Sequence, residues 1–219
     1  GNEAFNNNLG RAYIFEKQTD NSWLEVEVIE APSNWVMRLP FSEAENSRLR
    51  FGHSVALIGD VAIIGAYGDD DRGKDSGSAY IFVRDESGGS WSQVAKLTAE
   101  YRGTGTAAAD DLFGKSVAIA DGVAIVGAYG DDDDGARSGS VYIFEKEPTG
   151  SWTETKLTAF DAEQHNNFGQ SVAIADGVAI VGAPASPTTG SVYIFEKPVD
   201  GSWSDTETVK LTASDAAIG

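Results

Sequence analysis

Cysteine is absent from this 219-residue sequence, which excludes a disulfide framework and any thiol chemistry. The sequence has no run of about 18 apolar residues, so it contains no candidate transmembrane helix. Basic residues are scarce: 16 lysines and arginines stand against 34 aspartates and glutamates, and the formal net charge is −18. Because binding to nucleic acid needs a basic face, cations and basic proteins are the better candidate partners.

What the sequence does contain is a repeat. The stretch from Phe113 to Ala159 recurs with small changes, and its copies open at Phe51-Gly52, Phe113-Gly114 and Phe168-Gly169. Self-similarity on this length scale is the sequence signature of solenoids, propellers and other repeat arrays. The fold therefore has to be predicted from the repeating unit.

One unit is expected to form four antiparallel strands, named a to d in chain order. Ser116–Ala120 and Val123–Ala128 are apolar runs joined by Asp121-Gly122, a pair typical of two-residue hairpin turns. Val141–Phe144 is β-branched and aromatic, and Trp152–Ala159 alternates polar with apolar residues, like a strand with one solvated side. This order predicts a propeller blade, with strands a and b most buried and strand d at the outer edge.

The N-terminal segment matches only strands c and d of the unit. We therefore predict an all-β fold, a β-propeller section of about three and a half blades, because closed rings commonly hold about four to eight. An open array capped by partners is the alternative. The predicted divisions are a half blade at 1–31, an insert loop at 32–50, and blades at 51–112, 113–167 and 168–219.

The Phe-Gly-x-Ser start of each unit and the end of its strand b resemble the FG-GAP repeat, as in the β-propeller of integrin α subunits. The matching strand ends are Ile64-Gly65-Ala66, Val126-Gly127-Ala128 and Val181-Gly182-Ala183-Pro184. The resemblance implies a non-catalytic propeller module for protein recognition or cell adhesion, secreted, at the cell surface or in an organelle lumen. A scaffold subunit of a larger complex and a carbohydrate-binding propeller are alternatives.

Two of the three units carry an acidic loop between strands b and c. Clustered carboxylates can bind Ca²⁺, which takes about six to eight oxygen ligands, so we predict Ca²⁺ as a candidate cofactor here. The candidate ligands are Asp69, Asp70, Asp71 and Asp75 in the first loop, and Asp131, Asp132, Asp133 and Asp134 in the second. Alternatively the loops are solvated turns whose mutual repulsion is relieved internally by Arg72, Lys74 and Arg137.

The calcium sites of integrin-like propellers cannot be transferred to this sequence. In that family the Ca²⁺ loop lies between strands a and b. Here the corresponding link is reduced to Gly59-Asp60, Asp121-Gly122 and Asp176-Gly177, too short to surround an ion.

Alternation of strand direction should bring the b–c loops and the d–a connections to one face, which is the ligand face in integrin-like propellers. Asp110-Asp111, Asp161–Glu163 and the insert 32–50 should share that face.

The insert combines aromatic with basic residues and predicts a loop that docks a protein partner. Its candidate contact residues are Trp35, Met37, Arg38, Phe41, Arg48 and Arg50. Alternatively, Trp35 and Phe41 pack over the neighbouring blade.

Two other residue types recur once per unit. Ser54, Ser116 and Ser171 follow the Phe-Gly pairs and are expected to hydrogen-bond a turn rather than act as nucleophiles. Trp23, Trp91, Trp152 and Trp203 are expected to open strand d and to pack within the blades, rather than stack on sugars. His53 and His165 have no recognisable nucleophile or metal-ligand partner, so no catalytic site is predicted.

Overall fold

The computed structural model describes residues 9–32, 49–99, 109–185, 190–199 and 201–214, and its regular structure there is all β-strand. Each sheet is antiparallel, with strands that are consecutive in sequence lying side by side. Within the described ranges, no helix has the length and apolarity needed to cross a membrane. The predicted all-β fold with four-stranded blades is therefore confirmed.

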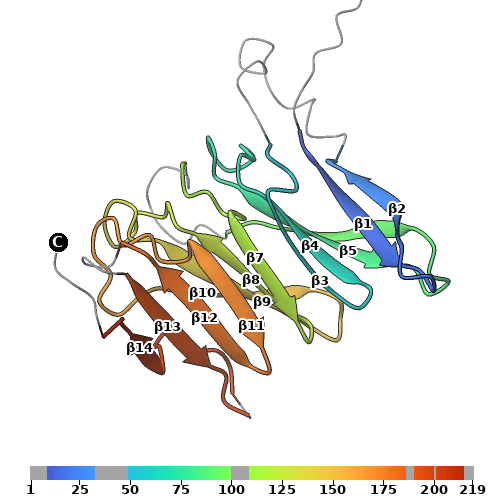
Figure 1. The fold of residues 1–219 in the computed structure, drawn as a ribbon. Helices are drawn as coiled ribbons and strands as arrows, with labels where there is room; N and C mark the ends of the chain where they lie inside the picture. Colours follow the sequence, from blue (N-terminus) through green and yellow to red (C-terminus); the bar gives the residue numbers. More distant parts are fainter. Residues whose placement is uncertain (1–8, 33–48, 100–108, 186–189, 200, 215–219) are drawn as a thin grey trace, which may run out of the picture.

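Four sheets follow one another along the chain, and Figure 1 shows them in sequence order from blue to red. The half blade is β1 (Arg11–Lys17) and β2 (Trp23–Glu30). Blade 1 is β3 (Ser54–Ile58), β4 (Val61–Ala66), β5 (Ser78–Arg84) and β6 (Trp91–Leu97). Blade 2 is β7 (Ser116–Ala120), β8 (Val123–Ala128), β9 (Ser140–Lys146) and β10 (Trp152–Leu157). Blade 3 is β11 (Ser171–Ala175), β12 (Val178–Ala183), β13 (Ser191–Glu196) and β14 (Val209–Leu211).

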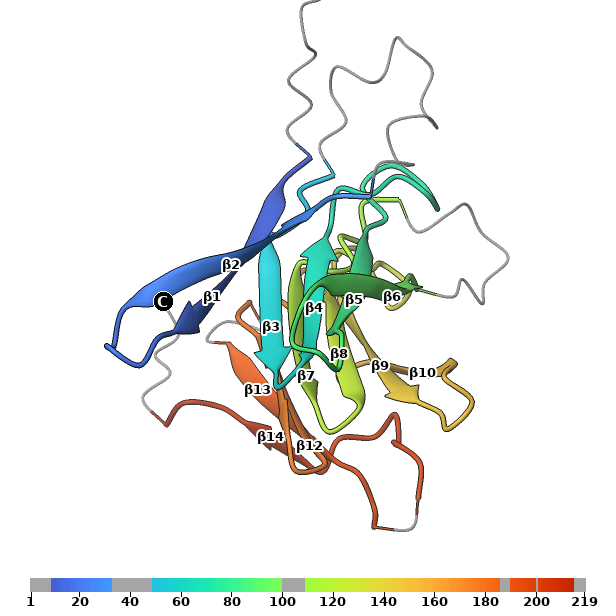
Figure 2. The same cartoon turned by 90° about the vertical axis from the view of Figure 1, so that its right-hand side faces the viewer.

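The core consists of three apolar layers, one at each junction between neighbouring sheets. Successive side chains on a strand point to opposite faces, so each inner strand contributes to two layers. In β8, for example, Val126 belongs to the layer shared with blade 1, whereas Ile125 belongs to the layer shared with blade 3. Figure 2 shows the half blade lying across the blade 1 end of this series, next to β3.

The turns between strands a and b of blades 2 and 3 have the predicted hairpin geometry. Asp121 and Gly122 have φ values of 48° and 76°, and Asp176 and Gly177 repeat them at 49° and 74°. Two consecutive positive φ values characterise the type I′ turn, whose twist matches that of the flanking strands.

The predicted order of burial was wrong in one respect, because strands b and c are the most buried, rather than a and b. Five of six residues in β4 and five of seven in β5 are buried, whereas β3 has no buried residue. The a strands β3, β7 and β11 are the innermost strands and lie beside one another. An a strand has a sheet neighbour on one side only, whereas strands b and c have one on each side.

Each Phe-Gly pair connects two sheets. The Phe113 N–H donates to the Ser76 carbonyl of blade 1 at 3.1 Å, and the Phe168 N–H donates to Ser138 of blade 2 at 3.0 Å. The Phe113 ring lies edge-on to Tyr142 in its own blade, with ring centroids 5.4 Å apart. A blade therefore begins with a segment whose backbone is bonded to the preceding sheet and whose ring packs into its own.

The recurring serines add hydrogen bonds at the same junctions, and here the donor belongs to the preceding blade and the acceptor to the following one. Ser54 Oγ donates to the Gly114 carbonyl of blade 2, and Ser116 Oγ donates to the Gly169 carbonyl of blade 3, each at 2.7 Å. The serines were predicted to bond a turn, and they do, but the turn is the Phe-Gly turn of the following blade.

Candidate functional site

The described parts of the b–c loops and of the d–a connections at 109–112 and 161–167 lie on one face, as predicted, whereas residues 33–48 of the insert lie outside the described ranges. The Asp110 and Leu112 N–H groups donate to the Lys74 and Asp75 carbonyls at 2.7 and 3.1 Å. At the next junction the His165 N–H donates to Ala136 at 2.8 Å. These bonds join the b–c loop of one blade to the segment that leads into the next. We call residues 67–77, 109–112, 129–139 and 161–167 the acidic loop face.

The first aspartate of each acidic loop is buried and holds the loop together. Asp69 is 0% exposed and Asp131 is 3% exposed. Asp69 Oδ1 accepts from the Asp71 N–H at 3.0 Å, and Asp131 Oδ1 accepts from the Asp133 N–H at 3.1 Å. These side chains therefore shape the loop backbone, because a short carboxylate can cap nearby N–H groups in a turn.

The second oxygen of each buried aspartate receives a tyrosine and a lysine. Tyr142 Oη donates to Asp131 Oδ2 at 3.1 Å, and Lys156 Nζ donates to the same oxygen at 2.8 Å and to Asp133 at 2.6 Å. In blade 1, Tyr80 donates to Asp69 at 2.9 Å, and Lys96 Nζ lies 2.7 Å from Asp69 and also contacts Asp71. Each lysine is directly opposite its tyrosine across strands c and d.

Blade 3 builds the same cluster with an aspartate from another place. Its b–c loop carries no acid, and Asp161, from the d–a connection before blade 3, accepts from Tyr193 at 2.8 Å and from Lys210. Burial alone would raise the pKa of Asp161, but the bonds from Lys210 and Tyr193 outweigh it and lower the pKa. An Asp-Tyr-Lys cluster therefore recurs in all three blades, although the source of its aspartate changes.

These clusters determine the surroundings of the predicted calcium ligands. Burial would lower the pKa of Lys156, but Asp131 and Asp133 reverse the effect and raise it, so the amine stays charged. The described residues contain no group of three or more acidic or histidine side chains arranged to hold a metal ion. The buried aspartates are neutralised by Lys96 and Lys156 of strand d, which the sequence did not indicate. Of the predicted Arg72, Lys74 and Arg137, Lys74 lies 3.7 Å from Asp75 and 3.6 Å from Asp110.

The calcium hypothesis stays a prediction with a direct test. It predicts that calorimetric titration of the chain detects Ca²⁺ uptake at millimolar concentration, and that Asp131→Asn with Asp133→Asn removes about one site. Because Lys156 lies between these carboxylates, Lys156→Met should tighten any Ca²⁺ binding. Absence of binding heat in both wild type and Lys156→Met would contradict the hypothesis.

The remaining candidate ligands are more exposed. Asp132 and Asp134 are exposed, and Asp75 lies 3.7 Å from Lys74. Asp70 is half-buried and accepts from the Asp75 N–H at 2.7 Å, and its burial raises its pKa. The loops thus divide into buried aspartates that fix the backbone and exposed ones that carry negative charge into solvent.

Asp111 is a buried acid on this face whose chemistry the sequence did not indicate. It is 8% exposed, and burial, together with the nearby Asp131 and Asp132, raises its pKa to about 7. Lys156 offsets only part of this effect. Asp111 therefore changes charge near neutral pH at the junction of blades 1 and 2.

Asp111 should make the chain less stable as the pH rises from about 4 to about 7. Over that interval the unfolded state has lost the proton that the folded state keeps, so ionisation favours unfolding, by on the order of 4 kcal/mol at pH 8. Asp111→Asn should remove this loss, leaving the variant more stable than wild type at pH 8 and similar at pH 4. Urea denaturation at both pH values measures it. The exposed neighbour Asp110→Asn is the control, and an equal effect of both variants would contradict the assignment.

Arg50 is the only predicted partner-binding residue within the described ranges; Trp35, Met37, Arg38, Phe41 and Arg48 lie outside them. Arg50 is exposed, and its guanidinium carbon lies 5.0 Å from the centroid of the Tyr67 ring. Lys115 Nζ lies 3.8 Å from the same centroid, and the His53 ring meets Tyr67 edge-on at 4.7 Å. Tyr67, which the sequence analysis missed, thus organises a small basic cluster beside the acidic loops.

The tryptophans behave largely as predicted. Trp91 and Trp152 are half-buried against the apolar layers, and Trp203 is buried between blades 2 and 3. Trp23 on the half blade is 65% exposed. One detail was wrong: Trp203 does not open strand d, because β14 spans only Val209–Leu211.

Comparison with known proteins supports the repeat assignment. A family model described as the FG-GAP repeat matches residues 45–82, 91–144 and 152–195, which together exceed half of the chain. The second and third matches run from strand d of one blade to strand c of the next, so the sequence motif crosses the junction between blades. Comparison with curated proteins gives no match.

One solved structure resembles the chain at the level of fold, and a second aligns with a smaller share of it. A Lactobacillus plantarum protein is 15% identical with a TM-score of 0.53, and the alignment covers 94% of this chain and 52% of that one. Saccharomyces cerevisiae Sqt1 is 14% identical with a TM-score of 0.43, covering 74% of this chain and 36% of that one. The chain thus spans about half of the first structure and about a third of the second.

Proposed function

Because the chain belongs to the FG-GAP repeat family, we propose that it is a non-catalytic recognition module whose acidic loop face binds a basic protein surface. The observation that carries the proposal is the arrangement of charge on that face. Asp69, Asp131 and Asp161 are paired with lysines and hold the loops in place, while exposed aspartates extend outward from this rigid base. A pre-organised excess of negative charge favours and steers a partner of positive charge.

The family supports the biological setting of this proposal. FG-GAP repeats often mediate protein interactions and are often extracellular. We therefore propose that the module acts in adhesion or recognition outside the cytoplasm. Expression of the tagged gene product followed by cell fractionation tests that setting, and recovery in the cytoplasm alone would contradict it.

The recognition proposal predicts a face-specific effect on binding of a basic probe. Asp132→Asn with Asp134→Asn removes two exposed charges from the acidic loop face, at about 0.5 kcal/mol each, and should weaken binding of a heptalysine peptide about fivefold. Asp121→Asn with Asp176→Asn removes two exposed charges from the a–b turns at the other end of the strands. That control should bind the peptide like wild type in calorimetric titration. An equal loss of affinity for both double variants would mean that the peptide responds only to the net charge of the chain.

A further inference from the structure

The outer face of blade 3 has no neighbouring sheet among the described residues, and this changes the exposure of residues that are buried in the other blades. Ile125 in blade 2 is 0% exposed, whereas the equivalent Ile180 in blade 3 is 42% exposed. Leu157 is 0% exposed and its equivalent Leu211 is 50% exposed. The surface through which blades 1 and 2 contact the following blade is therefore exposed to solvent in blade 3.

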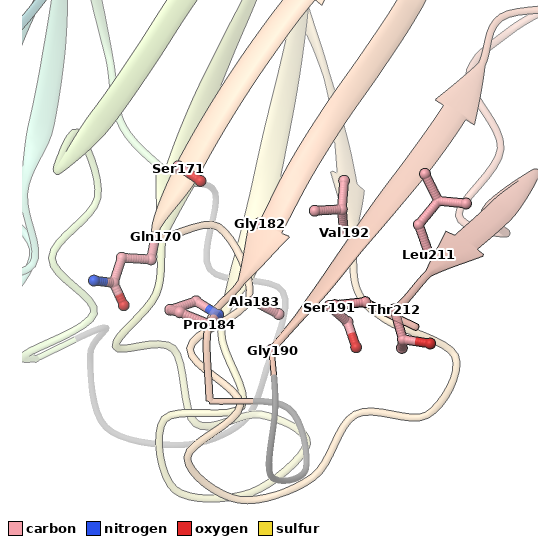
Figure 3. Close-up of a pocket in the computed structure, with 11 residues that line it drawn as sticks. Gln170, Ser171, Gly182, Ala183, Pro184, Gly190, Ser191, Val192, Leu211 and Thr212 are labelled. Carbon is pink, nitrogen blue, oxygen red and sulfur yellow. The ribbon is translucent and has the colours of Figure 1, made fainter. Parts of the chain in front are cut away.

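A groove of about 720 Å³ lies at the loop end of this face. Figure 3 shows its lining, which comes from all four strands of blade 3: Ser171 at the start of β11, Gly182 at the end of β12, Gly190 and Val192 around the start of β13, and Leu211 on β14. The groove is predominantly apolar, and its polar side chains are those of Gln170, Ser171, Ser191 and Thr212.

Blade 2 shows what the equivalent groove holds when it is filled. There the carbonyl oxygen of Gly169 accepts a hydrogen bond from Ser116 Oγ. The same oxygen lies only 2.0 Å from the position that a Cβ on Gly127 would occupy. The Phe168 carbonyl oxygen lies 2.1 Å from the position of a Cβ on Gly139. The backbone of one Phe-Gly pair thus packs against a serine and two glycines. Any side chain at the two glycine positions would collide with its carbonyl oxygens.

Blade 1 holds its following blade in the same way. Ser54, Gly65 and Gly77 surround Phe113-Gly114, with the two carbonyl oxygens each 2.0 Å from the positions of the absent Cβ atoms. In blade 3 the same three residue types recur as Ser171, Gly182 and Gly190. Among the described residues, the three heavy atoms nearest to the position of a Cβ on Gly182 all belong to Ser171 of its own blade, whereas in blades 1 and 2 the nearest atom is a carbonyl oxygen of the following blade.

We propose that the groove of blade 3 is a docking site for a Phe-Gly-x-Ser segment, the segment that opens a further blade of the same type. The apolar residues of β12, β13 and β14 accept the strands that follow this segment, while Ser171 donates to the carbonyl of its glycine. This proposal is independent of the acidic loop face, because the groove and the exposed aspartates belong to different residues and different chemistry.

A peptide with the sequence of residues 166–175, which fills the blade 2 groove in the folded chain, tests the proposal. Added to the ¹⁵N-labelled intact chain, it should cause saturable shifts of the Ser171, Gly182 and Gly190 amides. Gly182→Ala should weaken binding of the peptide at least tenfold, because the added Cβ would occupy the position of the incoming carbonyl oxygen. A control peptide carrying Phe168→Ala and Gly169→Ala should cause none of these shifts.

Three results would overturn the proposal. These are the absence of saturable shifts with the wild-type peptide, equal shifts with the control peptide, and a chain that sediments as a dimer which Gly182→Ala converts to monomer. The last result would mean that a second copy of the chain covers the groove. Failure of the heptalysine experiment would leave the groove proposal standing, and failure here would leave the acidic face untouched.

Discussion

The Gly127→Ala substitution is expected to lower the free energy of unfolding by at least about 3 kcal/mol. A Cβ at Gly127 would lie 2.0 Å from the Gly169 carbonyl oxygen and 2.2 Å from Ser116 Oγ. The serine side chain can rotate away, but the carbonyl belongs to the backbone of blade 3, so the two blades would have to separate. Separation would open the apolar layer that they share and expose it to water.

Gly182→Ala is the matched control for this prediction. Its Cβ would meet Ser171 Oγ at 2.3 Å, as in blade 2, but no backbone of another blade. Neither glycine has a positive φ, so backbone strain does not distinguish them. Gly182→Ala should therefore lower the free energy of unfolding, measured by urea denaturation, by less than about 1 kcal/mol. Equal losses at Gly127 and Gly182 would show that the Phe-Gly segment of blade 3 does not lie against Gly127.

The second large effect is expected at Lys156. Lys156→Met should destabilise the chain by about 3 kcal/mol, because it leaves the Asp131 carboxylate buried without its charged partner. The Asp131 side chain is 4% exposed, so solvent cannot replace the ammonium group without disturbing the loop. Urea denaturation at neutral pH measures the loss.

Two comparisons make the Lys156 result specific. The double variant Asp131→Asn with Lys156→Met removes both charges and should recover most of the lost stability. Lys146→Met, at the exposed end of β9, removes the same charge from a lysine outside the cluster and should change stability little. A double variant no more stable than Lys156→Met alone would argue against a buried ion pair.

Local strand patterns could be read from the sequence because each depends on neighbours along the chain. Ser116–Ala120 and Val123–Ala128 form β7 and β8 with the predicted bounds, since two β-prone runs flank a turn that requires positive φ. The half blade was predictable for the same reason. Strand d of blade 3 was placed too early because Trp203 was taken to begin the strand, although its ring packs between blades 2 and 3 outside it.

The Asp-Tyr-Lys clusters were harder to predict because they depend on register across strands. Lys156 contacts Asp131 only because it lies opposite Tyr142 in the β9–β10 pair. A signal was present, since a lysine precedes Leu-Thr-Ala in all three units of an acidic chain. The sequence alone could not indicate that Asp161 replaces the missing loop aspartate in blade 3, because that contact joins residues 49 positions apart.

Amide shift mapping with the heptalysine peptide tests the central functional claim most directly. In ¹⁵N-labelled chain, the proposed recognition face predicts saturable shifts concentrated in residues 69–75 and 131–137, with the a–b turns at 59–60, 121–122 and 176–177 unchanged. Added salt should reverse these shifts, because screening weakens exposed charge pairs. Shifts that are largest at the a–b turns, or spread evenly over both ends of the strands, would contradict a recognition role for the acidic loop face.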